Sequence, residues 1–114
     1  QLRYAWRGVL TERREAIDGL LSWDFAESLS EAEKHSLMAM QSMDMGDFIL
    51  CVVHMKRALR GINLAMSLLP NLVNLAEGNE AFQRGLFSRL FDLREVCLRV
   101  ITDCRDEDRR SFGQ

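Results

Sequence analysis

Residues 48–69 constrain the fold more than any other segment, because they are apolar around most of a helix. Their main stripe recurs at spacings of three and four and consists of Phe48, Val52, Met55, Leu59, Ile62, Met66 and Leu69. This spacing predicts an α-helix. The narrow polar side implies that several neighbouring elements cover the helix. Pro70 follows directly and is expected to end it, because proline disfavours a helical conformation in the preceding residue.

The rest of the chain predicts further helices. A single proline, no hairpin-type Asn-Gly or Asp-Gly pair and no strict apolar alternation argue against strands. Apolar periodicity predicts one helix over residues 2–22, with a break near Gly8 and Thr11 left open. The capping box that begins at Ser30 predicts a helix over residues 31–43, preceded by a connector holding Trp23 and Phe25.

Asn79 is expected to cap a long final helix over residues 80–106, and residues 70–76 are a candidate short helix. Sequential helices with short connections usually pack as neighbours. The predicted fold is therefore all-α, an antiparallel bundle of four to five helices with a long C-terminal helix. Residues 107–114 are charged and are expected to form a frayed tail.

Length and composition predict one domain over residues 1–114. Hydrophobic residues make up 47% of the chain and charged residues 28%, which is typical of a globular domain. The first residue is Gln1, and we expect a fragment of a longer protein. A net charge of -2 disfavours a polybasic membrane binder, and no apolar stretch has the length of a membrane span. Three cysteines, an odd number, favour a reducing compartment, so the expected location is cytoplasmic or nuclear.

Cys51 and His54 form the only spacing that resembles a metal-ligand pair. A structural zinc site usually takes four ligands from two short-spaced pairs, and no second pair is present. Cys97 and Cys104 lie on one predicted helix about 10 Å apart, too far for a disulfide. No nucleophile elbow or phosphate-binding glycine pattern appears. We therefore expect no metal, no cofactor and no enzymatic activity.

Two groups of residues are candidates for binding a partner. Tyr4, Trp6, Met38, Met43 and Met45 are the interface candidates, because the methionines around the second helix exceed what one narrow face can bury. Lys56, Arg57 and Arg60 form a basic patch in a stretch without acids. The patch either meets a partner or pairs internally with the acidic stretch 24–47, and charge runs of this kind are most often paired or solvated.

These features favour a protein–protein interaction module that self-associates or docks a partner helix through its apolar and arginine-rich surface. The expected partner is another protein or a second copy of the chain. The alternative is a nucleic-acid-binding helical domain in which the basic patch contacts phosphates.

Overall fold

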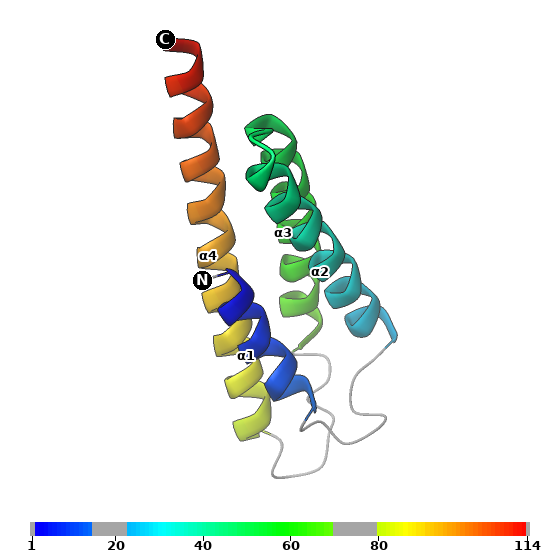
Figure 1. Ribbon diagram of the computed structural model, residues 1–114. Helices are drawn as coiled ribbons and strands as arrows, with labels where there is room; N and C mark the ends of the chain where they lie inside the picture. Colours follow the sequence, from blue (N-terminus) through cyan, green and yellow to red (C-terminus); the bar gives the residue numbers. More distant parts are fainter. Residues whose placement is uncertain (1, 15–22, 70–79, 114) are drawn as a thin grey trace.

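The computed structural model describes residues 2–14, 23–69 and 80–113, which form four helices and no strand. These are α1 (Leu2–Arg14), α2 (Trp23–Asp44), α3 (Phe48–Leu68) and α4 (Glu80–Gly113). The predicted all-α class is confirmed. Neighbouring helices run antiparallel, as Figure 1 shows, in agreement with the predicted bundle and its long last helix. The candidate helix 70–76 and the Asn79 cap lie outside the described residues.

The core lies along α3, which packs against α2 on one side and α4 on another, while α1 packs mainly on α4. Met55, Ala58 and Ile62 of α3 are fully buried. Leu86, Leu90 and Leu93 of α4 are fully buried too. The apolar stripe of residues 48–69 therefore does what its width predicts and contacts more than one neighbour.

α2 begins at Trp23, eight residues before the start at residue 31 that the capping box predicts. Trp23 and Phe25 lie inside this helix and not in a connector, and Ser30 is an exposed residue within it. Phe25 and Leu29 are fully buried, four residues apart, so their burial extends the helix past the local start signal. Tertiary packing has overridden the capping box.

The turn between α2 and α3 has the residue types that its geometry requires. Gly46 has a φ of +78°, a left-handed conformation that glycine adopts without a steric cost. Asp47 then caps α3, and its carboxylate accepts a hydrogen bond of 3.1 Å from the backbone N–H of Leu50. This tight turn fixes α2 and α3 as an antiparallel pair.

α2 and α3 approach each other closely at Gly61. A Cβ atom on Gly61 would lie 2.7 Å from the carbonyl oxygen of Ser28 and 3.0 Å from the Cβ of Ala32. Ala32 of α2, and Ala58 and Ala65 on either side of Gly61 in α3, are small and fully buried. The hydroxyl groups of Ser28 and Ser36 donate to carbonyls one turn earlier in α2, so their burial leaves no unsatisfied donor.

α4 is much longer than its neighbour α1. Its 34 residues span about 51 Å and the 13 residues of α1 about 20 Å. α4 continues to Gly113, past the predicted end near residue 106; fraying of residues 107–114 in solution stays a prediction. α1 thus covers only part of α4, and Figure 1 shows its N-terminus beside the middle of α4.

Candidate functional site

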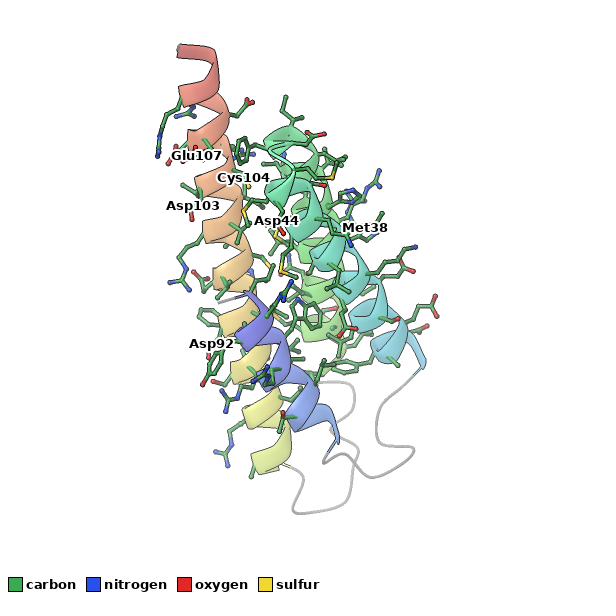
Figure 2. All side chains as sticks on the ribbon, in the orientation of Figure 1. Met38, Asp44, Asp92, Asp103, Cys104 and Glu107 are labelled. Atoms are coloured by element: carbon green, nitrogen blue, oxygen red, sulfur yellow. The ribbon has the colours of Figure 1, made fainter. Side chains whose placement is uncertain are left out.

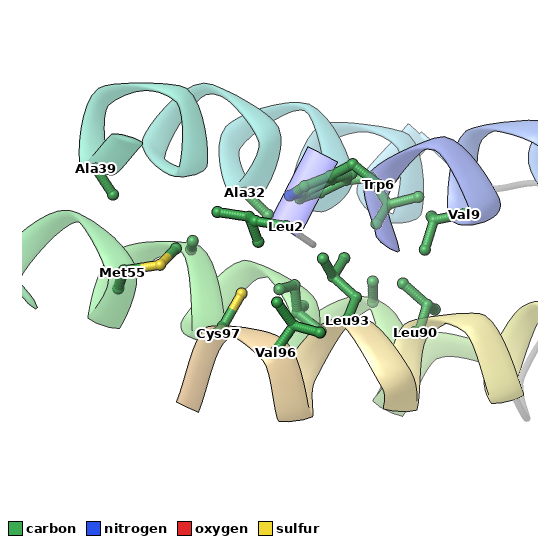
Figure 3. Close-up of a cluster of buried hydrophobic side chains, with 14 of the residues drawn as sticks. Leu2, Trp6, Val9, Ala32, Ala39, Met55, Leu90, Leu93, Val96 and Cys97 are labelled. Carbon is green, nitrogen blue, oxygen red and sulfur yellow. The ribbon is translucent and has the colours of Figure 1, made fainter. Parts of the chain in front are cut away.

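α1 occupies one half of a seam between α2 and α4. Its residues Leu2, Trp6 and Val9 are buried, and Figure 3 shows them directed between the two longer helices. Buried residues of α4 such as Leu93 and Val96 lie on the other side of this layer. The lower half of the seam therefore already holds an amphipathic helix.

Beyond the N-terminus of α1, the same seam is an open groove of about 350 Å³. The groove is lined by Leu2, Arg3, Met40, Met43, Val96, Arg99, Val100 and Asp103. Its walls are apolar, and its charged lining residues are two arginines and one aspartate. A concave apolar surface with a few charges at its edge is suited to bind the apolar face of a helix.

A second hollow, of about 310 Å³, lies between α1 and α2 and shares Arg3 and Met40 with the groove. It adds Arg7, Leu37 and other side chains to the recessed surface along α2. The two hollows are therefore parts of one recessed surface that follows α2.

The five interface candidates do not lie together. Met43 lines the groove. Tyr4 is 74% exposed and lines a separate hollow between α1 and α4. Met45 is 84% exposed in the turn after α2, and Met38 lies on the flank of α2 that is turned away from α4 (Figure 2).

Trp6 is the interface candidate that the structure buries. It is only 5% exposed, because it packs in the core between α2 and α4, although it is among the residues that line the hollow between α1 and α2. Its role in an interface stays a prediction. Its indole Nε1 is the one buried side-chain nitrogen or oxygen in the described part of the chain without a hydrogen-bond partner. Leaving such a donor unpaired costs about 1–3 kcal/mol.

Sequence reasoning missed the groove as a site, and of its lining residues it named only Met43 as an interface candidate. Val96, Val100 and Arg99 become a wall only because α1 starts beside the middle of α4. The axial offset between the two helices is a property of the tertiary structure. The one available signal was the difference in length between the predicted helices.

The basic patch lies on the exposed face of α3. Lys56, Arg57 and Arg60 are all exposed, and no ion pair joins any of them to an acid within the described residues. Ile49 and Leu64 are exposed on the same helix. This face is therefore mixed, with apolar side chains next to the cations.

Cys51 and His54 contact different partners and do not form a common site. The Sγ atom of Cys51 lies 3.0 Å from that of Cys104, whereas Nδ1 of His54 lies 3.4 Å from Nδ1 of His35. No group of three potential metal ligands occurs in the described residues. Burial raises the pKa of Cys51 to about 12, with a further contribution from Cys104, and burial alone raises that of Cys97 to about 12. These thiols are poor nucleophiles at neutral pH.

No family model matches this chain, and neither a curated protein nor a solved structure matches it. Among the helical residues that the structure describes, no stretch combines the length and the hydropathy that a membrane crossing requires. The groove, the basic face of α3 and the buried pairs must therefore be interpreted from their own chemistry.

Proposed function

We propose that this chain is a protein–protein interaction module that docks an amphipathic helix of another protein in the groove between α2 and α4. The observation that carries the proposal is the occupation of the same seam by α1, itself a helix with a buried apolar face formed by Leu2, Trp6 and Val9. A second helix in the groove would extend the same packing along the seam.

The charges at the groove favour a partner with acidic residues. Arg3 and Arg99 are exposed beside the apolar walls, against the single carboxylate of Asp103. Arginine forms two parallel hydrogen bonds to a carboxylate, which adds orientation to the apolar contact. The expected partner helix therefore presents apolar residues at spacings of three and four, flanked by Asp or Glu.

Methionine suits the proposed role. Met40 and Met43 line the groove from α2, and methionine side chains adapt their shape to different apolar partners. The exposed apolar residues Phe87, Phe91 and Leu98 of α4 form a separate surface that is not part of the groove. A second copy of the chain could instead occupy any of these surfaces, and light scattering of the chain alone tests this self-association directly.

The proposal is tested by selecting helical peptides from a displayed library for binding to the chain and measuring their affinity. Met43→Glu places a charge in the groove and should weaken binding at least tenfold, about 1.4 kcal/mol. Met45→Glu is the matched control, because Met45 is exposed outside the groove. Equal affinities of the two variants, or selected helices without acidic residues beside an apolar face, would count against this function.

The basic face of α3 carries a second candidate function, nucleic-acid binding. It is favoured by the exposure of Lys56, Arg57 and Arg60 without ion pairs inside the described part of the chain. Binding of an RNA or DNA duplex should weaken steeply with salt, and a Lys56→Ala/Arg60→Ala variant should flatten that dependence. No binding at low salt, or an unchanged slope in the variant, removes this candidate.

A further inference from the structure

Two buried thiols from different helices meet in the upper half of the bundle. The Sγ atom of Cys104 on α4 donates to the Sγ atom of Cys51 on α3, and the two sulfur atoms are 3.0 Å apart. Both residues are at most 1% exposed, and both carry free thiols. A covalent S–S bond measures about 2.05 Å, so bond formation needs the sulfur atoms to approach by about 1 Å.

We propose that Cys51 and Cys104 are a disulfide site, at which a low-molecular-weight disulfide such as oxidised glutathione reversibly cross-links α3 to α4. Forming the bond removes one proton and one electron from each thiol. The two protons and two electrons reduce one molecule of oxidised glutathione to two thiols, so the exchange is balanced. Dithiothreitol reverses it.

Cys97 provides an internal comparison. It is fully buried on the same helix as Cys104, seven residues earlier, and no thiol of the described residues lies within bonding distance of it. If burial or α4 alone determined oxidation, Cys97 would react as Cys104 does. The pairing with Cys51 is what distinguishes Cys104.

The burial of the two thiols and the raised pKa of Cys51 both slow the reaction. The thiolate is the attacking species, and burial keeps Cys51 protonated at neutral pH. Because both thiols are almost fully buried, oxidised glutathione reaches them only when the end of α4 separates transiently from α3. Oxidation should therefore be slow, and it should accelerate as the pH rises. The site would form a stable disulfide slowly, unlike a catalytic cysteine that reacts rapidly.

The position of this disulfide has a consequence for the groove. Cys104 directly follows Asp103, which lines the groove, and Figure 2 shows both on the upper half of α4. The disulfide would hold this half of α4 against α3 and limit how far the wall can move. This consequence rests on the proposed docking function, whereas formation of the bond does not.

The test is incubation of the folded chain with oxidised glutathione, followed by mass spectrometry. We expect a loss of about 2 Da, corresponding to two hydrogens, and a non-reduced peptide that joins Cys51 to Cys104. Cys97→Ala should react like the wild type, while Cys104→Ala should not gain an internal disulfide. The midpoint of urea unfolding should rise on oxidation and return with dithiothreitol.

Two results would overturn the disulfide site. One is a folded wild type that keeps three free thiols, or gains only mixed glutathione disulfides, under conditions that oxidise the urea-unfolded chain. The other is a disulfide that includes Cys97. Mapping the bond in the wild type keeps the test decisive even where an alanine variant fails to fold. Peptide affinity of the oxidised and reduced chains is a separate readout, so failure of the groove proposal leaves the disulfide result intact.

Discussion

Nδ1 of His35 on α2 lies 3.4 Å from Nδ1 of His54 on α3, while the ring centroids are 5.6 Å apart. Because the centroid separation is 2.2 Å longer, the two nitrogens face each other along the line between the rings. One imidazole can therefore donate Nδ1–H to the lone pair of the other. Glu31 lies 3.7 Å from Nε2 of His35, on the far side of that ring. A carboxylate and two imidazoles thus follow one another across the helix pair.

This pair predicts a loss of stability in mild acid. The pKa of His54 is lowered from its ordinary value of 6.5, first by burial and then by the nearby His35 and Arg57. The unfolded chain therefore binds more protons at this position, and the contribution to stability is full above pH 6.5 and declines as the pH falls below it. Urea unfolding of the wild type from pH 7.5 to 5 should show this decline.

His54→Gln is the matching variant, since glutamine keeps a hydrogen-bonding group but does not titrate. Its free energy of unfolding should depend less on pH below 6.5 than that of the wild type. Titration of the His54 ring by NMR gives the pKa directly. A midpoint at or above 6.5, or equal pH dependence of the two proteins, would contradict this interpretation of the pair.

Gly61→Ala should destabilise the chain by about 1–3 kcal/mol, because the new methyl group collides with the backbone of α2. The obstructing atom is the carbonyl oxygen of Ser28, 2.7 Å from the Cβ position, and it cannot move without shifting the helix. Gly8→Ala is the control. There the nearest atom is Cδ of Arg89 at 3.2 Å, in a flexible side chain.

Alanine favours a helix over glycine by up to about 1 kcal/mol, so Gly8→Ala should be neutral or stabilising in urea unfolding. A similar loss of stability in both variants would show that α2 and α3 are not as close at Gly61 as the structure describes.

Asp47→Ala should lower stability by about 1 kcal/mol, because it removes the acceptor that caps the backbone N–H of Leu50. Asp44 is a nearby acid that lies at the C-terminus of a helix instead of an N-terminus, because it is the last residue of α2. Its carboxylate lies near the negative end of that helix, so Asp44→Ala should be neutral or stabilising by a few tenths of a kcal/mol. The midpoint of thermal unfolding should therefore fall in Asp47→Ala and stay unchanged or rise slightly in Asp44→Ala. An equal fall in both variants would argue against the cap.

The sequence predicts α3 almost to the residue, because its determinants are local. Gly46, Asp47 and Pro70 mark its ends, and the apolar spacing of residues 48–69 defines its length. The capping box at Ser30 is just as local, yet α2 passes through it. Burial of Phe25 against the rest of the bundle is a tertiary effect that no short window of sequence contains.

The candidate site is less predictable than the helices for the same reason. The helical spacing of Leu93, Cys97 and Val100 predicts an inward-facing stripe on α4, but whether α1 covers Val100 depends on the axial offset of the two helices. Cys51 and Cys104 are 53 positions apart, so no spacing rule brings them together. Conversely, Trp6 has a residue type typical of interfaces, and only its packing reveals that it belongs to the core.

The chain's methionines allow the most direct test of the docking groove. In a chain with labelled methionine methyl groups, an acidic helical peptide selected for binding should shift the NMR signals of Met40 and Met43, which line the groove. The signals of Met45, in the exposed turn, and of Met55, fully buried on α3, should stay in place. Shifts at Met45 without shifts at Met40 and Met43 would place the partner elsewhere and contradict the account.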